Sequence, residues 1–239
     1  MQPGTLFQTY LKQGYLLLED NPLQGLLPDI TVACEQVYEW ARFSKSSQVE
    51  TYRDGQPKII FGPHLINSRI AGLCLTQKFA YISSICISPE NLYLYQMKLT
   101  SSSPKQPGAG FPWHQDYHNW RVRDGVPTAQ MVNIILFIDD VEIEDGPIEA
   151  FPTSHLRGYR TSEGPRLPDQ QLADLSFPPI PLTGKRGTVL LMHPCLVHGS
   201  RPRAGKRRRL LLFVTLNSLS NTPNKGSHNY YSESRRLKF

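Results

Sequence analysis

The chain has 239 residues, of which 39% are hydrophobic and 19% are charged, with a formal net charge of +6 and four cysteines. A domain of this length can bury roughly 70% of the surface of its unfolded chain, so it needs no disulfide staples. The cysteines show no CxxC spacing, which argues against a zinc ribbon and a disulfide framework. The N-terminus lacks a secretory signal pattern, and no apolar run approaches the ~20 residues that span a bilayer. These features exclude a membrane segment and favour a cytoplasmic location.

The first ninety residues are expected to be mostly helical. Apolar residues recur at helical spacing over 5–13, 28–43 and 68–83, and Pro28 and Asp29 supply a start signal for the second of these helices. In that helix the spacing places Val37 and Trp40 on the apolar face. Residues 15–19 are a candidate strand.

From residue 91 the pattern changes to strands. The segment "NLYLYQMKLT" alternates, which predicts Tyr93, Tyr95 and Met97 on one face and Gln96 and Lys98 on the other. Further strands are predicted over 131–138, 187–194 and 208–217, each rich in β-branched, aromatic or other apolar residues.

The order of these elements predicts the fold class. Strands that follow helices, without a regular βαβ alternation, indicate antiparallel strands with helices packed on one side. We therefore expect a mainly β fold, a double-stranded β-helix (jelly-roll) core flanked by N-terminal helices. The chain would form a single domain over 1–239, with a helical part over about 1–90, the jelly-roll core over about 91–217 and a loosely held polar tail over 218–239. Two long polar segments, 100–110 and part of 157–184, are candidate lids.

The segment "FPWHQDYHNW" (111–120) carries the first candidate site. On a strand, residues two apart point the same way, so His114 and Asp116 would project from one face. An imidazole and a carboxylate side by side are two members of the 2-His-1-carboxylate set of non-haem Fe(II) oxygenases. HxD alone is a weak signal, because a histidine capped by a carboxylate in a turn gives the same pattern.

The third ligand would be a histidine from another strand. The candidates are His64, His118, His155, His193 and His198, with His228 remote in the tail. His198 is favoured, since it follows the predicted strand 187–194 and a turn that can return beside the first histidine, and His193 is the second choice. Oxygenases of this kind mostly use 2-oxoglutarate, whose distal carboxylate needs a cation, and Arg209 begins a predicted strand eleven residues after His198.

These segments resemble a known family. "FPWHQDYHNWRVRDGVP", "VNIILFIDDVEIEDGPIEAFPTSHLRG" and "GTVLLMHPCLVHGSRP", together with Arg209, look like the phytanoyl-CoA dioxygenase family of Fe(II)/2-oxoglutarate oxygenases. Within it the sequence is most similar to ectoine hydroxylase and to free-amino-acid hydroxylases. The resemblance covers roughly residues 91–217.

The resemblance implies a role for each matching position. The following residues would bind iron, the cosubstrate or the substrate: His114, Asp116 and His198 as metal ligands and catalytic centre; Arg209, Ser200, Phe111, Lys98 and Asn133 around 2-oxoglutarate; Gln96 and Trp120 around the substrate. His155 would be structural, and His118 would lie behind the metal ligands or at the surface. Fe(II), 2-oxoglutarate and O₂ would be required, with ascorbate as an activator in vitro.

The substrate is expected to be a small amino-acid-like or amino-acid-derived metabolite, which would be hydroxylated. Leu211 departs from ectoine hydroxylase, which has a substrate-contacting asparagine at that position, so ectoine itself is not the expected substrate. An acyl group tethered to a carrier protein or to CoA is an alternative. A second alternative is nucleic-acid binding or modification by the basic run 201–209, although this run lacks the interleaved aromatic residues that such binding uses. The oligomeric state stays open.

Overall fold

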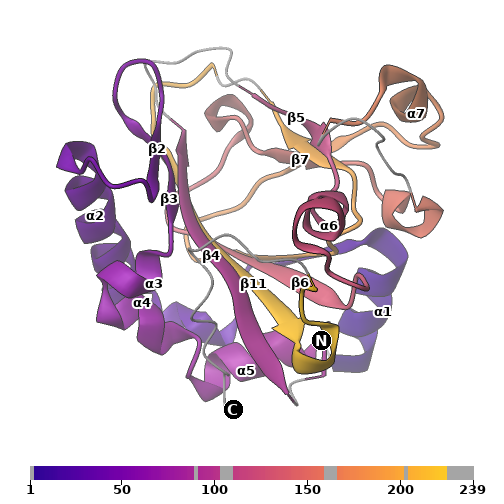
Figure 1. Ribbon diagram of the computed structural model, residues 1–239, viewed down its shortest axis with the longest axis horizontal. Helices are drawn as coiled ribbons and strands as arrows, with labels where there is room; N and C mark the ends of the chain where they lie inside the picture. The colour runs from indigo at the N-terminus through magenta and orange to yellow at the C-terminus, as the bar shows by residue number, and fades with distance from the viewer. Residues whose placement is uncertain (1–2, 89–90, 103–109, 159–165, 202–203, 225–239) are drawn as a thin grey trace.

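The computed structural model describes residues 3–88, 91–102, 110–158, 166–201 and 204–224. Two antiparallel sheets make up the core of the fold (Figure 1). The larger sheet has the strand order β1-β9-β6-β11-β4-β3-β2, and the smaller sheet has the order β5-β10-β7-β8. This arrangement confirms the expected jelly-roll core with flanking helices.

The strands have the following bounds: β1 Tyr15–Leu18, β2 Val49–Thr51, β3 Pro57–Phe61, β4 Leu92–Ser102, β5 Phe111–His114, β6 Met131–Phe137, β7 Ile148–Ala150, β8 Ile180–Leu182, β9 Val189–Met192, β10 His198–Ser200 and β11 Arg209–Ser218. The α-helices are α1 Pro3–Gln13, α2 Leu27–Phe43, α3 Pro63–Ile66, α4 Ser68–Leu73, α5 Gln77–Ser84, α6 Asp116–Asn119 and α7 Asp169–Ala173. Short 3-10 turns lie at Pro22–Leu26, Ile143–Asp145, Ser154–Arg157 and Leu219–Asn221, and Trp120–Asp124 is a π-helical turn.

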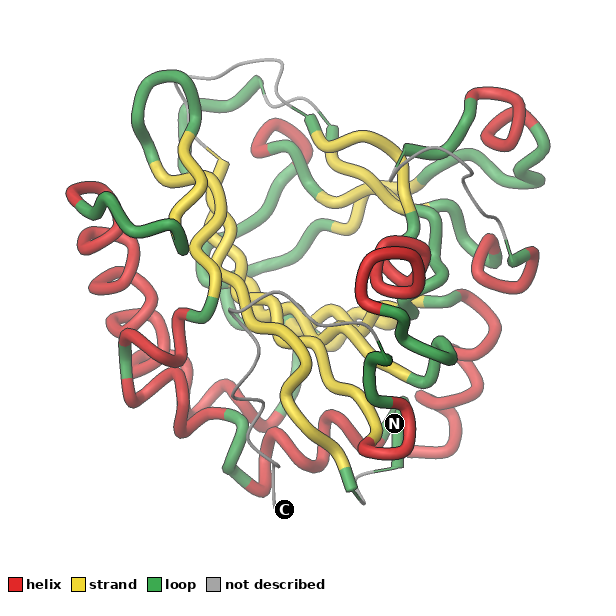
Figure 2. Tube along the Cα trace, in the orientation of Figure 1, coloured by secondary structure: helices red, strands yellow, loops and turns green. Residues whose placement is uncertain are grey.

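The N-terminal helices cover the outer face of the larger sheet (Figure 2). Alternate residues of β11, such as Leu210, Leu212 and Val214, join a buried cluster with Val37 of α2 and Phe79 of α5. The other residues of β11 face the smaller sheet. One face of the larger sheet therefore packs against the helices, and the other face borders the space between the two sheets, where the candidate site lies.

The N-terminal part contributes more strand than the sequence predicted. β1, β2 and β3 form both edges of the larger sheet, so the part expected to be mostly helical supplies three of its seven strands. The predicted helix 68–83 is two helices: α4 ends at Leu73, and Thr76 caps α5 by accepting a hydrogen bond from the Phe79 N–H. The helix predicted over 28–43 is confirmed as α2, but Trp40 is 39% exposed and lies off its buried face.

A bulge changes the predicted faces of β4. Gln96 pairs with Thr215 and Leu94 pairs with Leu216, so Tyr95 is an extra residue in the ladder. The alternation shifts at this point. As a result Tyr95 packs in a separate cluster with Trp120, whereas Met97 faces the helices, and the prediction that these two side chains share a face was wrong.

The other segments are partly described. The stretch 157–184, part of which is a candidate lid, contains α7 and β8. Residues 103–109 and 159–165 of the candidate lids lie outside the described residues. The first part of the polar tail is held firmly: Asn221 is 2% exposed, and its side-chain carbonyl accepts a hydrogen bond from the Thr128 N–H at 2.8 Å. Within the described ranges no helix has the length and apolar character to cross a membrane.

Candidate active site

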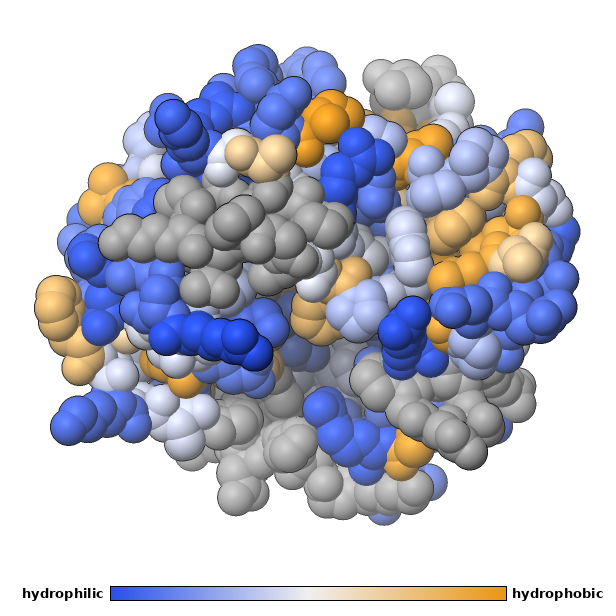
Figure 3. All heavy atoms as spheres, turned by 90° about the horizontal axis from the view of Figure 1, so that it is seen from above, coloured by the Kyte–Doolittle hydropathy of each residue, from blue (hydrophilic) through white to orange (hydrophobic). Residues whose placement is uncertain are grey.

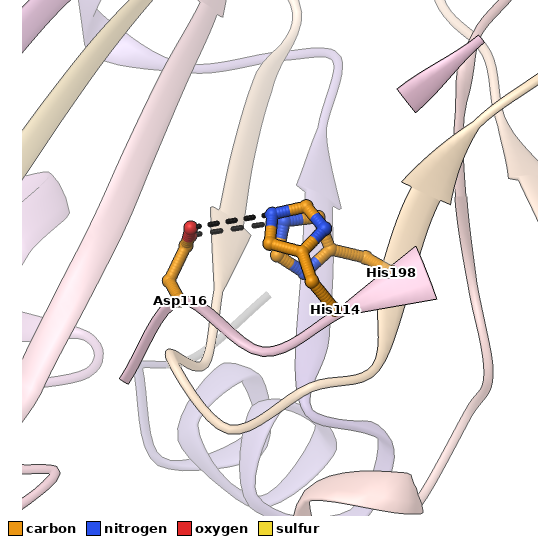
Figure 4. A group of neighbouring side chains, drawn as sticks. All are labelled: His114, Asp116 and His198. Carbon is orange, nitrogen blue, oxygen red and sulfur yellow. Dashed lines mark ion pairs between the residues drawn. The ribbon is translucent and has the colours of Figure 1, made fainter. Parts of the chain in front are cut away.

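Three ligand side chains converge between the two sheets (Figure 4). His114 is the last residue of β5 and His198 the first of β10, and the two lie directly opposite each other in the antiparallel ladder. Their ring centroids are 4.2 Å apart. Asp116 approaches both rings, with Oδ1 at 3.5 Å from Nε2 of His114 and Oδ2 at 3.7 Å from Nε2 of His198. One ligand atom from each residue lies within 4.8 Å of the others.

Backbone contacts orient both imidazoles. Nδ1 of His114 lies 2.9 Å from the carbonyl oxygen of Pro112, and Nδ1 of His198 lies 2.9 Å from that of Leu196. A carbonyl oxygen only accepts, so Nδ1 carries the proton in each ring and Nε2 presents a lone pair. Both lone pairs therefore point to the place that the carboxylate also faces. Such a contact fixes the tautomer of a metal-binding histidine.

Electrostatics favours the ligand forms of these groups. Burial, and then the neighbouring His114, lower the pKa of His198 to about 4, so its imidazole is neutral at pH 7. For Asp116, burial raises the pKa, but the neighbouring His198, His114 and Lys98 together outweigh it, and the net pKa lies below the usual range. The site thus offers imidazole nitrogens and a carboxylate anion, the donor set expected for Fe(II).

The route to this geometry differs from the prediction. Asp116 is not on a strand, because β5 ends at His114 and Asp116 begins α6. Gln115 between them is still extended, at φ −120° and ψ 127°, so residues 114 and 116 project to the same side as they would in a strand. Gln115 faces away from the ligands, and its Nε2 donates a hydrogen bond to the carbonyl of Cys195 at 2.7 Å.

A buried hydrogen-bond chain holds the carboxylate. Asn133 Nδ2 donates to Asp116 Oδ2 at 2.7 Å, and Thr215 Oγ1 donates to Asn133 Oδ1 at 2.6 Å. Asn133 and Thr215 are each 1% exposed and face each other across β6 and β11. Asn133 is therefore close to the predicted centre, but its amide contacts the metal-ligating carboxylate and it is not among the side chains that line the cavity.

The ligands open into a cavity of about 640 Å³. Arg209 lines it from the first position of β11 and is 8% exposed; its Nη1 donates to the carbonyl of Gly146. Ser200 lies nearby on β10, where its Oγ accepts a hydrogen bond from the Phe111 N–H at 2.8 Å. A hydroxyl that accepts one hydrogen bond still has its proton to donate. Arg209 and Ser200, the two residues predicted to contact the distal carboxylate of 2-oxoglutarate, thus line the same cavity as the metal ligands.

The remaining predicted contacts also line this cavity. The Phe111 ring lies 4.9 Å from that of His114, and the Lys98 ammonium lies 5.0 Å from the ring centroid of Phe213. Gln96 is buried on β4. Trp120 contributes to the cavity wall and to a buried aromatic cluster, with its ring 5.3 Å from that of Tyr95.

The other histidines lie apart from the ligands or do not join them. His193, the second choice for third ligand, packs against Tyr10 at 6.1 Å and His155 at 5.0 Å, and Nδ1 of His193 accepts the Cys195 N–H. His155 Nε2 lies 2.9 Å from the Leu11 carbonyl, a contact that ties its turn to α1. His118 lines the cavity without joining the triad, His64 is outside both, and His228 lies outside the described residues.

The basic run pairs with acidic residues of the chain itself. Arg201 contacts Glu149 at 2.5 Å, Arg207 contacts Asp145 at 2.6 Å, and Arg208 contacts both Asp139 and Glu35. Pro202 and Arg203 lie outside the described residues. These ion pairs give the basic run a structural role, and they reduce the positive charge that it presents to a polyanion.

Sequence reasoning missed one part of the cavity wall. Glu50, Tyr52 and Lys58 of the β2–β3 hairpin line it, about sixty residues before the first metal ligand. Asp54 and Gly55 lie in the turn of this hairpin, where Gly55 has a positive φ of 78°, but strands of three and five residues are too short to show from the sequence which side chains face inward.

Comparison with known proteins agrees with this site. Residues 10–210 match the phytanoyl-CoA dioxygenase (PhyH) family. The chain belongs to this family. Together with the His114–Asp116–His198 triad, this makes it a non-haem Fe(II)- and 2-oxoglutarate-dependent dioxygenase.

Individual relatives are amino-acid and ectoine oxygenases. The chain is 33% identical over 153 residues to the L-proline trans-4-hydroxylase of Streptomyces griseoviridis. This match covers 55% of this chain and only 57% of that enzyme. It is 26% identical over 229 residues to the ectoine dioxygenase of Sphingopyxis alaskensis, covering 88% and 74%. The crystal structure of EctD from S. alaskensis with 2-oxoglutarate and 5-hydroxyectoine superposes with a TM-score of 0.86 at 22% identity, covering 98% of this chain and 85% of that one.

Proposed function

We propose that this chain hydroxylates a C–H bond of a small amino-acid-like or amino-acid-derived metabolite, in the cytoplasm. The observation that carries the proposal is a triad of two imidazoles and a carboxylate that opens into the same cavity as a buried arginine. The relatives support the substrate class, because one is a proline hydroxylase and others are ectoine dioxygenases.

Each residue of the site has a proposed role in binding iron or 2-oxoglutarate. His114, Asp116 and His198 would hold iron on one side only and leave the cavity side for other ligands. Arg209 would bind the distal carboxylate of 2-oxoglutarate, and Ser200 would donate its hydroxyl proton to the same group. When bound, iron and 2-oxoglutarate supply the oxidising chemistry, in which O₂ is consumed, succinate and CO₂ are released and one oxygen atom goes to the substrate.

The cavity walls would position the substrate. Gln96 offers an amide and Trp120 offers a flat apolar face, which together suit a small ring or chain with polar ends. Leu211, in contrast, packs in a buried cluster with Ile135 and Phe137 and does not line the cavity. This packing supports the expectation that ectoine itself is not the substrate.

Mass spectrometry tests the proposal. The purified protein is incubated with Fe(II), ascorbate and 2-oxoglutarate, together with single amino acids or a small-molecule cell extract. We expect a product that is heavier by one oxygen atom and that forms only when 2-oxoglutarate is present. His114→Ala should abolish it, because the iron loses a ligand. A product that forms equally with the His114→Ala protein, or no product from amino acids and extract alike, would refute the proposal.

A further inference from the structure

The cavity extends beyond the groups that the proposed reaction uses. On one side it is bounded by the β2–β3 hairpin, from which Glu50, Tyr52 and Lys58 contribute to the wall. The face seen from above in Figure 3 is hollowed near its centre, and both hydrophilic and apolar side chains lie at the rim of the hollow. Neither iron nor 2-oxoglutarate needs the two charges on this hairpin, because the metal and Arg209 already match the two carboxylates of the cosubstrate.

A β-bulge turns Lys58 towards the cavity. Glu50 pairs with Ile59 and Thr51 pairs with Pro57, so Lys58 is the extra residue on β3. In a regular strand Lys58 would share a face with Ile60, which is buried among the helices. Bulges redirect side chains in this way and are frequent next to active sites. Instead, Lys58 lines the cavity.

Two aromatic rings hold the Lys58 ammonium close to the metal ligands. Its Nζ lies 5.9 Å from the ring centroid of Tyr52 and 5.8 Å from that of Phe111. The Tyr52 hydroxyl donates to the Ser101 carbonyl at 3.0 Å, which fixes the first ring. The second ring is in turn 4.9 Å from that of His114. One ring therefore separates the ammonium from a metal ligand, a distance that a small metabolite can span.

Glu50 provides an opposite charge on the same hairpin. It lies directly across the ladder from Ile59, which lines the cavity, so both side chains are on the cavity face, with Glu50 exposed at the rim. Two other charged groups of the wall have partners: Arg123 contacts Asp124, and Arg201 contacts Glu149. Among the described residues, neither Lys58 nor Glu50 forms an ion pair, with each other or with a third group.

We propose that the β2–β3 hairpin binds the head group of a zwitterionic substrate, Lys58 its carboxylate and Glu50 its ammonium. A cation and an anion that are on one wall but do not pair with each other match the two charges of an α-amino acid, whose two charged groups can bridge them. With its head group bound at the hairpin, the rest of the substrate would extend towards the metal ligands. The proposal rests on the proposed function, since it specifies the substrate class of the same site.

Binding without turnover tests this proposal. Protein loaded with Co(II) and 2-oxoglutarate is titrated under nitrogen with each of the twenty common amino acids in a calorimeter. For the tightest ligand, its carboxamide and the analogue without the amino group are also titrated. The variants are Lys58→Met and Glu50→Gln, and Arg53→Met is the matched control, because Arg53 is an exposed cation of the same hairpin that does not line the cavity.

The expected pattern separates the two charges. Lys58→Met should lower the affinity for the amino acid about tenfold or more but change the affinity for the carboxamide little. Glu50→Gln should lower the affinities for the amino acid and the carboxamide, and leave the affinity for the analogue without the amino group unchanged. Arg53→Met should bind like the wild type. Equal affinities in all four proteins overturn the proposal, and so does a wild type that binds none of the twenty amino acids.

Failure of the hairpin proposal differs from failure of the proposed function. If no amino acid binds but an extract component gains an oxygen atom, the oxygenase function stands and the head-group site is wrong. If the variants show the expected pattern but nothing is oxygenated, the head-group site stands and the proposed reaction is wrong.

Discussion

The hydrogen-bond chain behind Asp116 predicts that Asn133→Leu weakens metal binding. Asn133 Nδ2 donates to Oδ2 of the carboxylate at 2.7 Å, and its own carbonyl is fixed by Thr215. In the wild type this contact holds the carboxylate so that Oδ1 faces Nε2 of His114 and Oδ2 faces Nε2 of His198. Leucine has a similar volume but cannot donate, so the carboxylate loses a fixed orientation and a charge-assisted hydrogen bond.

The size of the effect follows from the chemistry of this contact. A hydrogen bond to a charged group contributes about 1.5–3 kcal/mol. Loss of a partner that orients a metal ligand typically costs about 10–100-fold in metal affinity, and 100-fold corresponds to about 2.7 kcal/mol. The buried position, at 1% exposure for Asn133, leaves no water to replace the amide, so we expect the upper half of this range.

Co(II) titration under nitrogen measures this prediction, with the d–d absorption bands as a readout that does not depend on turnover. Asn217→Leu is the control, because Asn217 is also fully buried, on β11, but its amide contacts Tyr93 and Asn221 rather than a metal ligand. We expect Asn217→Leu to lower stability and keep the Co(II) affinity. An Asn133→Leu protein that is folded by circular dichroism and binds Co(II) as tightly as the wild type would show that the chain has no role in orienting Asp116.

Three further outcomes are expected. Arg209→Gln should raise the apparent KM for 2-oxoglutarate at least tenfold in a succinate assay. Arg207→Gln should not, because Arg207 forms an ion pair with Asp145. Equal effects of the two substitutions would indicate a diffuse charged patch. Burial, and then His155, lower the pKa of His193 from 6.5 to about 4, so on acidification the unfolded chain takes up the proton before the folded chain does. The free energy of unfolding, measured by urea titration, should therefore fall by up to about 3 kcal/mol as the pH drops from 6.5 towards 4. An equally steep fall in His193→Gln would exclude this histidine as the cause. Co(II) should raise the Tm of the wild type but not of His198→Ala, and a matching rise in both would place the metal elsewhere.

Local patterns in the sequence were sufficient for the long elements and for the ligands. The helical spacing over 28–43 and the apolar run before residue 217 correspond to α2 and β11. The two-residue spacing of His114 and Asp116 predicted one shared side, and that side is correct even though the strand ends between them, since Gln115 stays extended.

The rest depends on contacts between distant residues. The bulges at Tyr95 and Lys58 arise from the registers of β4 and β3 with their neighbours, which no single segment reveals. Strands of three residues, such as β7 and β10, are too short to show a period. The basic run looked like a surface patch because its partner acids, such as Asp145 opposite Arg207, lie about sixty residues earlier in the sequence.

The position of both anchors on β11 explains how one scaffold can serve several substrates. Arg209, which lines the cavity, and Thr215, which fixes Asn133, lie on the same face of a strand that is paired with β4 without interruption from one to the other. Because β11 is central and hydrogen-bonded on both sides, the spacing between the proposed cosubstrate clamp and the metal carboxylate is rigid. The β2–β3 hairpin, in contrast, is at the edge of the same sheet, where substitutions at Glu50 or Lys58 would alter the proposed head-group site without moving either anchor.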